Sequence, residues 1–384
     1  MAENSVNVSL KEGPYSEVAR LIGIPNVTDQ AQSVALAGDG QTLAVGTRGN
    51  GGVYVFVNNC GVWEQQANLV IANSSSQGNS VSLSFDGNYL VSGAPSDKTG
   101  GISVGAAFVF HREGVTWTQM GDKLVGSNNI GASQQGASVA ISKNGKTIAV
   151  GGPGDGTVGA VWTFIFNGTI WVQDAKLIGS NGYMSQQGTS VALSEDGTIL
   201  AEGGFTDDND RGAAWVFERI EGTWIQNGPK LFGCGSIGGS FQGISVSLDS
   251  CGKLLAVGGS GTANIGVVFI YERIKNKWKQ FGNKISGKGP LKTAALGVSV
   301  SLSGNGNLLA IGASFFDASG TTLIFKRKNC KYVLIQIVTG SNSNPNQFQG
   351  SSVSFSANGK TLAVGGPGRL GSGTQGMTWI FDNH

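Results

Sequence analysis

Short stretches of the chain alternate between hydrophobic and polar residues, which is the period of a β-strand with one buried face. SVALS (190–194) has this pattern, EDG follows as a tight turn, and TILAEGG (198–204) reads as the returning strand. Asp-Gly and Asn-Gly favour such hairpins because both residues tolerate positive φ. These pairs begin at Asp39, Asp86, Asn144, Asp196, Asn305 and Asn358, and Cys251 occupies the position in the one remaining copy. The pattern predicts seven similar hairpins.

The hairpin belongs to a longer repeat. The copies align on Val34, Val81, Val139, Val191, Val246, Val300 and Val353, and a glycine follows six residues later in each. A third strand rich in aromatic and β-branched residues comes next, as in VYVF (53–56), and a fourth is typified by TWTQMGDKLVG (116–126). Four strands per repeat predict an all-β, seven-bladed β-propeller. We expect one domain over 1–384, with blades that begin near residues 32, 79, 137, 189, 244, 298 and 351.

The seventh repeat lacks its fourth strand. It ends soon after TWIF (378–381), whereas the chain starts with YSEVARLIG (15–23), which matches the fourth-strand segment WVQDAKLIG (171–179). Pairing of the first strand with the last three would close the ring and cover an exposed sheet edge. We therefore expect residues 15–23 to complete blade 7, after an extension at residues 1–14.

Composition narrows the class of protein. The 384 residues include 63 Gly, which fits many tight turns, and only 13% are charged, with a net charge of +2. The N-terminus has no basic region followed by an apolar segment, and no stretch approaches 18 apolar residues. We expect a soluble chain that is neither exported nor bound to a membrane.

Cysteine placement indicates the redox compartment. In a propeller of this phase, Cys251 falls in a turn between the first and second strands, and Cys60 and Cys330 fall in turns between the third and fourth strands of blades 1 and 6. Cys234 falls on the opposite face. None of these should approach another within the roughly 7 Å Cα separation of a disulfide. We expect four free thiols and a reducing, cytoplasmic location.

One run of residues resembles a known repeat. Gln-Gly-x-Ser-Val-Ala-Leu-Ser-x-Asp-Gly-x-x-Leu-Ala-Val-Gly-Gly-Pro, nearly intact at 135–153 and 349–367, resembles the FG-GAP repeats of integrin α-subunit propellers. The chain looks closest to short-repeat propeller proteins of bacteria and giant DNA viruses. The resemblance implies a virus-encoded, virion-associated protein. The calcium cage of integrin repeats does not carry over, because each turn here offers one carboxylate or amide, and no cofactor is expected.

Candidate metal ligands gather in one loop. FTDDNDRG (205–212) places Asp207, Asp208 and Asp210 between the second and third strands of blade 4. Two interpretations remain open, namely a solvated acidic loop and a cation site. The spacing matches no known loop and Arg211 adjoins it, so the solvated loop is favoured.

Catalytic groups are scarce. The only histidines are His111 and the terminal His384, which leaves little for a histidine metal cluster or a Ser-His-Asp array. Glu202 stands out because other blades have Val, Ile or Ser there. It is interpreted either as a buried polar residue or as a site near the central channel. We expect no enzymatic activity.

The long loops form the first candidate binding surface. Loops on a rigid scaffold often carry recognition, and aromatic side chains dominate interface energetics. Candidates on this loop face are Tyr183, Phe205, Phe315, Phe316 and Arg369. The alternative is that the aromatic residues cap the blade ends, which is favoured for Phe241 and Phe348 in the recurring FQG.

Basic residues form the second candidate surface. They lie on neighbouring hairpins of blades 5 and 6, namely Arg273, Lys275, Lys277, Lys279, Lys326, Arg327, Lys328 and Lys331. They would suit a polyanion such as nucleic acid. Lysines also protect sheet edges from aggregation, which is the alternative.

These patterns favour a non-catalytic interaction or structural scaffold with a protein partner. Two alternatives remain, namely a carbohydrate-binding or carbohydrate-acting propeller that uses the loop face, and a polyanion-binding protein that uses the basic hairpins.

Overall fold

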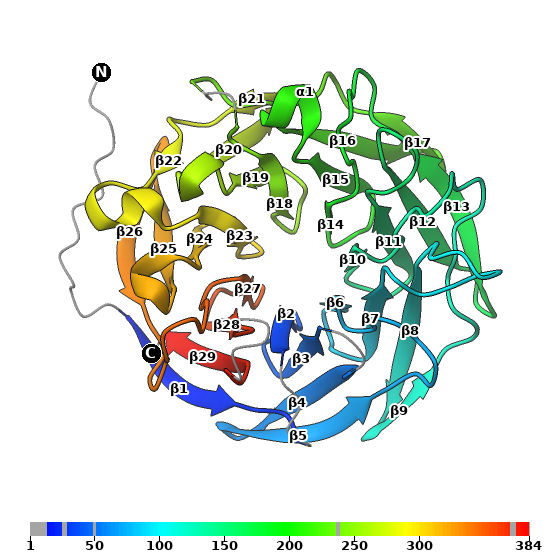
Figure 1. Cartoon of the computed structure of the whole chain (residues 1–384), viewed down its shortest axis with the longest axis horizontal. Helices are drawn as coiled ribbons and strands as arrows, with labels where there is room; N and C mark the ends of the chain where they lie inside the picture. Colours follow the sequence, from blue (N-terminus) through cyan, green and yellow to red (C-terminus); the bar gives the residue numbers. More distant parts are fainter. Residues whose placement is uncertain (1–13, 25–28, 49–50, 236–238, 369–373, 384) are drawn as a thin grey trace.

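Seven sheets, six of four strands and one of five, are arranged in a ring around a central channel (Figure 1). A computed structural model describes residues 14–24, 29–48, 51–235, 239–368 and 374–383. Each sheet is antiparallel, and its first strand lies innermost. The sequence prediction of an all-β, seven-bladed propeller is confirmed.

The strands follow the repeat. Blade 1 comprises β2 (Gln30–Leu36), β3 (Thr42–Thr47), β4 (Val53–Asn59) and β5 (Val62–Leu69), and blade 2 comprises β6 (Ser80–Leu83), β7 (Tyr89–Ala94), β8 (Ala106–Glu113) and β9 (Thr116–Gln119). Blade 3 comprises β10 (Ser138–Ile141), β11 (Thr147–Gly152), β12 (Ala160–Phe166) and β13 (Trp171–Leu177), and blade 4 comprises β14 (Ser190–Leu193), β15 (Ile199–Gly204), β16 (Ala213–Ile220) and β17 (Thr223–Gln226). Blade 5 comprises β18 (Gln242–Leu248), β19 (Leu254–Gly259), β20 (Val267–Ile274), β21 (Lys277–Gln280) and the short β22 (Ile285–Ser286). Blade 6 comprises β23 (Leu296–Leu302), β24 (Leu308–Ala313), β25 (Thr321–Lys328) and β26 (Lys331–Val338), and blade 7 comprises β27 (Ser352–Phe355), β28 (Thr361–Gly366), β29 (Met377–Asn383) and β1 (Tyr15–Leu21).

Helical segments are confined to loops. They are the short turn α1 (Asp207–Asp210) and the 3-10 turns η1 (Thr262–Asn264), η2 (Gly289–Thr293) and η3 (Phe316–Ala318). No helix of the described residues is long and apolar enough to cross a membrane.

The hairpin turns show why Ser-x-Asp-Gly recurs. In blade 4, the Ser194 hydroxyl donates to Asp196 Oδ1 (2.5 Å), and the Thr198 backbone N–H donates to the same oxygen (3.0 Å). The Ile199 N–H in turn donates to Ser194 Oγ (3.0 Å). Gly197 has φ +72°, a conformation that glycine adopts without steric cost. Local polar contacts therefore define each turn.

The hydrophobic core lies between blades rather than within them. Between blades 3 and 4, Ala149 and Val161 pack against Leu200 and Trp215, all fully buried. Trp215 Nε1 donates to the Ser180 carbonyl (2.9 Å), and its ring lies against Gly179, where a Cβ would come within 2.2 Å. The third-strand tryptophan thus explains the glycine that follows the fourth strand.

A buried glutamine at the start of most blades joins neighbouring repeats. Gln187 Oε1 accepts from the Gly179 N–H (2.5 Å), and Gln187 Nε2 donates to the Gly179 carbonyl (3.0 Å). Gln30, Gln77, Gln135, Gln242 and Gln349 hold the corresponding segments before their own blades. Leu296 replaces the glutamine in blade 6. Since the amide oxygen and the amide nitrogen of Gln187 both bond to backbone, the connection that enters blade 4 is held in place.

The ring closes where the sequence predicts. β1 pairs antiparallel with β29, from Tyr15 opposite Asn383 to Leu21 opposite Thr378. Tyr15 is buried, its hydroxyl donates to the Gly359 carbonyl, and its backbone N–H donates to Gln336 Oε1 (2.9 Å). The N-terminal strand is thus tied to blade 6 as well as to blade 7.

Candidate functional site

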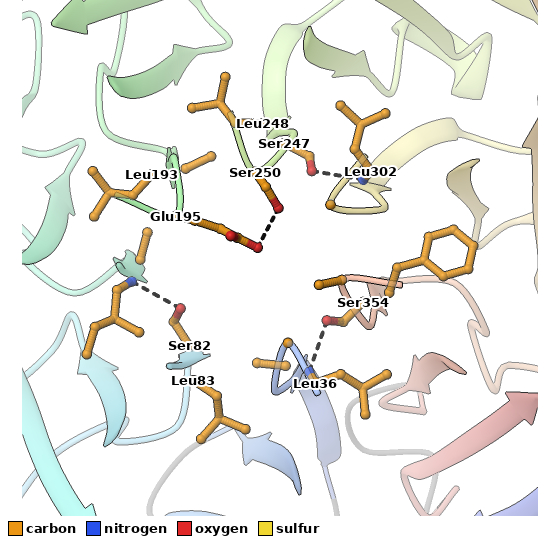
Figure 2. Close-up of a pocket in the computed structure, with 18 of the residues that line it drawn as sticks. Leu36, Ser82, Leu83, Leu193, Glu195, Ser247, Leu248, Ser250, Leu302 and Ser354 are labelled. Carbon is orange, nitrogen blue, oxygen red and sulfur yellow. Dashed lines mark hydrogen bonds between the residues drawn. The ribbon is translucent and has the colours of Figure 1, made fainter. Parts of the chain in front are cut away.

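The central channel is lined by the first strands of all seven blades and encloses about 410 Å³ (Figure 2). Ser82, Ser247 and Ser354 lie on its wall, and each hydroxyl oxygen accepts a backbone N–H from the next blade, from Ile141, Leu302 and Leu36. Leucine and valine side chains fill the spaces between them. These serines therefore join blades.

A closed circle of backbone hydrogen bonds surrounds one mouth of the channel. In each turn between first and second strands, one N–H donates to a carbonyl of the next blade at 2.8 to 3.1 Å. The seven donor–acceptor pairs are Asp39 to Phe85, Phe85 to Lys143, Lys143 to Glu195, Glu195 to Ser250, Ser250 to Gly304, Gly304 to Ala357 and Ala357 to Gly38. The circle fixes the turns relative to one another.

The side chains at this mouth are unevenly distributed. Lys143 Nζ lies 4.1 Å from the Phe85 ring centroid and 3.5 Å from Glu195 Oε2, and the Ser250 hydroxyl donates to Glu195 Oε1 (2.5 Å). Figure 2 shows Glu195 and Ser250 meeting at the channel rim. The other blades contribute only Gly38, Gly304 and Ala357. The charges of Lys143 and Glu195 therefore offset each other.

The acidic loop of blade 4 does not bring its carboxylates together. Asp207 is buried, pairs with Lys230 Nζ (2.5 Å) and accepts the Tyr183 N–H at Oδ1 (2.8 Å). Asp208 points to Arg211 instead (3.7 Å). Among the residues that the structure describes, no three metal-ligating side chains converge. Asp207 thus anchors the loop internally, and Asp210 is exposed beside it.

The Asp207 pair is one of a series. Blade 2 pairs Asp97 with Lys123 (2.5 Å), and blade 3 pairs Asp155 with Lys176 (2.6 Å). In all three blades the aspartate lies in the loop between second and third strands, and the lysine precedes the leucine at the end of the fourth-strand segment. The sequence contained this signal as an aspartate and a lysine that recur at two fixed positions of the repeat in blades 2, 3 and 4.

The aromatic candidates on the loop face differ in exposure. Tyr183 is 64% exposed and Phe315 is 49% exposed. Phe205 is half-buried with its ring 6.0 Å from that of Phe241, and Phe316 packs on the blade 5–6 core. Phe348 is half-buried against Phe315 (5.2 Å between centroids). Arg369 lies outside the described residues. Tyr183 and Phe315 are therefore the accessible members.

The basic hairpins of blades 5 and 6 are neighbours. Arg327 of blade 6 pairs with Glu272 of blade 5 (2.8 Å), and Arg273 pairs with Glu218 of blade 4 (2.5 Å). These arginines tie the third strands of adjacent blades together, and Arg219 on β16 pairs with Asp174 on the fourth strand of blade 3 (3.0 Å). The remaining cations are exposed, namely Lys275, Lys277, Lys279, Lys326, Lys328 and Lys331.

Glu202 lies between blades 3 and 4, not in the channel. It is on β15, opposite Val191 and Trp215, and is fully buried. Neither carboxylate oxygen has a hydrogen-bond partner. Burial raises the pKa of Glu202 well above its usual value, and the nearby Gly179 N–H offsets this only in part. Of the two interpretations of Glu202, the structure therefore supports a buried polar residue and not a site at the central channel.

The cysteine prediction is confirmed for all four residues. Cys60, Cys234, Cys251 and Cys330 are free and exposed. The cytoplasmic location that we infer from them stays a prediction.

Comparisons with known proteins identify the fold. The chain matches no protein-family model and no curated protein sequence. Among solved structures it is similar to Kuenenia stuttgartiensis hydrazine synthase, with 15% identity and a TM-score of 0.60 over 90% of this chain and 95% of that one. It is also similar to a chain of a mitotic checkpoint complex (15%, 0.62, covering 99% and 98%) and to U3-55K (14%, 0.60, covering 94% and 97%). The FG-GAP resemblance and a viral origin stay predictions.

Proposed function

We propose that the chain is a non-catalytic scaffold that binds a protein partner through its loop face. The observation that carries the proposal is the distribution of exposed large apolar side chains. Of 18 such residues in the described part of the chain, ten lie on the loop face. They are Ile24, Val70, Ile102, Ile130, Ile178, Tyr183, Met184, Phe232, Ile265 and Phe315.

Three of these residues surround α1 and form what we call the blade-4 patch, namely Tyr183, Met184 and Phe232. The Tyr183 N–H is held by Asp207, the Met184 carbonyl accepts from Thr206 Oγ1 (2.5 Å), and the Arg211 guanidinium lies 3.9 Å from the Phe232 ring. Exposed aromatic and methionine side chains beside an arginine are typical of interface cores. Because their backbone is anchored, binding would cost little ordering entropy.

The rest of the molecule supports this use. Among the described residues, hydroxyls at equivalent positions join six blades to the next, as when Ser138 donates to Gly188 (2.8 Å) and Ser190 donates to Gly243 (2.8 Å). Loops on such a rigid frame are suited to recognition. One solved structure with this fold is part of a checkpoint complex, which fits a role in assembly.

The test of this proposal replaces the three residues of the blade-4 patch with serine. We expect Tyr183→Ser, Met184→Ser and Phe232→Ser together to abolish co-purification of the partner from a lysate of the source organism, while the melting temperature changes by less than about 2 °C. The control carries Val62→Ser, Val115→Ser and Ile170→Ser on the outer hairpins, where exposure is comparable. Equal loss of partners in both variants, or in neither, would refute the loop-face proposal.

A second candidate function rests on the six exposed lysines of blades 5 and 6. We expect Lys275→Glu, Lys277→Glu, Lys326→Glu and Lys328→Glu together to weaken binding to duplex DNA more than about tenfold, because several phosphate contacts are lost. The control reverses Arg20, Lys98, Lys146 and Lys360, which are exposed on other blades. Fluorescence anisotropy at two salt concentrations measures both. A similar reduction by both sets would leave the lysines as protectors of sheet edges.

A further inference from the structure

Blade 5 keeps the lysine of the recurring ion pair but has no aspartate for it. Lys284 occupies the position of Lys176 and Lys230, and its Nζ donates to the Gly235 carbonyl (2.8 Å), as Lys176 does to Asn128 (2.6 Å) and Lys230 to Asn181 (2.9 Å). Among the described residues, no carboxylate pairs with Lys284. The ammonium group of Lys284 is therefore held as in blades 3 and 4, but without the aspartate carboxylate that those blades provide.

Thr262 stands where the aspartate belongs. It is the third residue after Gly258-Gly259, as Asp207 is the third after Gly203-Gly204. Its hydroxyl donates to the Gly239 carbonyl (2.9 Å) and supplies no charge. Thr262 is exposed and lines the same cavity as Lys284, so the substitution of threonine for aspartate leaves this part of the cavity wall without a negative charge.

A cavity of about 580 Å³ lies at this position. Lys284, Lys288 and Lys292 line it, and none of its described lining residues is acidic. Ile265 and Val267 contribute apolar wall, and five glycines bring backbone close to the space. The volume falls within the roughly 300 to 1,000 Å³ of small-molecule sites and greatly exceeds what one aspartate side chain would fill.

We infer that this blade-5 cavity binds a small organic anion, whose carboxylate or phosphate group pairs with Lys284 in the place that aspartate takes in blades 2, 3 and 4. Lys284 and Lys292 raise the local potential for an anion, and the partial burial of Lys284 reduces screening by solvent and salt. The apolar wall contacts the remainder of the ligand. The site includes no residue of the blade-4 patch, although Ile265 also belongs to the exposed apolar residues of the loop face.

The test is isothermal titration calorimetry of the full chain with citrate, succinate and inorganic phosphate. We expect at least one to bind with a Kd below about 1 mM. Thr262→Asp should weaken that binding at least tenfold, because it installs the internal carboxylate that three sibling blades already hold. Lys284→Met should weaken it equally, whereas Lys360→Met, on the opposite face, should leave it unchanged.

Comparison of the three probes also identifies the anionic group that the cavity binds. Tighter binding of citrate or succinate than of phosphate assigns the site to a carboxylate, and the reverse order assigns it to a phosphate. Thr262→Asp keeps every lysine, so its loss of binding cannot come from a missing cation, and its melting temperature reports whether it folds. Absence of binding by all three probes, or equal binding by wild type and Thr262→Asp, would overturn the inference.

Discussion

Deleting residues 1–24 is expected to lower the melting temperature by at least about 10 °C and to cause aggregation. The deletion removes β1, so the backbone groups of β29 lose the partners that run from Asn383 to Thr378. It also removes the buried side chains of Tyr15 and Leu21. Six residue pairs at roughly 1 kcal/mol each, together with two buried side chains at about 2 kcal/mol each, make the loss on the order of 10 kcal/mol.

The deletion has a matched control. A chain that lacks only residues 1–12 keeps β1 and should melt like the full protein. A synthetic peptide of residues 13–24 should restore stability to the shorter chain in trans, because an exposed sheet edge accepts an added strand. Calorimetry and light scattering measure these effects. If the chain without residues 1–24 melted like the full chain, β1 would not be what closes the ring.

The fold was predictable because its determinants are local and repeated. Ser194, Asp196 and Gly197 define a hairpin turn through contacts within a few residues, and the same residue types recur around the ring. The position of the closing strand was equally accessible, because Tyr15 to Gly23 matches a fourth strand found elsewhere in the chain. Because the pattern repeats, both the number of blades and the closure of the ring could be predicted from the sequence.

Contacts between blades were harder to foresee. The circle of backbone bonds at the channel mouth depends on how far the first strands approach each other, which no residue type encodes. The pairing of Asp155 with Lys176 joins two segments of one blade, and only comparison of repeats reveals it. That comparison also shows that Thr262 breaks the series. The sequence analysis examined Asp207 only with its neighbours in the same loop and so missed its actual partner, Lys230.

Glu202 shows where the strand pattern was misjudged. Its departure from Val, Ile or Ser was visible in the repeat, but its side-chain direction was not. Alternate residues of a second strand face the two neighbouring blades, and Glu202 shares its side of β15 with Leu200. It therefore lies in the blade 3–4 core, where neither carboxylate oxygen has a hydrogen-bond partner among the described residues.

Replacing Glu202 with valine is expected to stabilise the protein, most strongly at alkaline pH. Val45, Val150, Val257 and Val364 occupy the same position in four other blades, so the side chain should fit. Because burial raises the pKa of Glu202, the native state keeps the proton while the unfolded chain loses it above about pH 4.5. The native state then binds more protons, and the free energy of unfolding falls as pH rises from about 4.5 toward the native pKa.

Urea unfolding of wild type and Glu202→Val at pH 5, 6.5 and 8 measures this dependence. The difference in free energy of unfolding should grow by about 1.4 kcal/mol for each pH unit above the unfolded-state pKa, until pH reaches the native pKa. Glu202→Gln separates charge from polarity, because it removes the titration but keeps an unpartnered buried polar group. It should lose the pH dependence and remain less stable than Glu202→Val at every pH. A difference between wild type and Glu202→Val that stays constant across the three pH values would show that the carboxyl ionises normally in the folded protein.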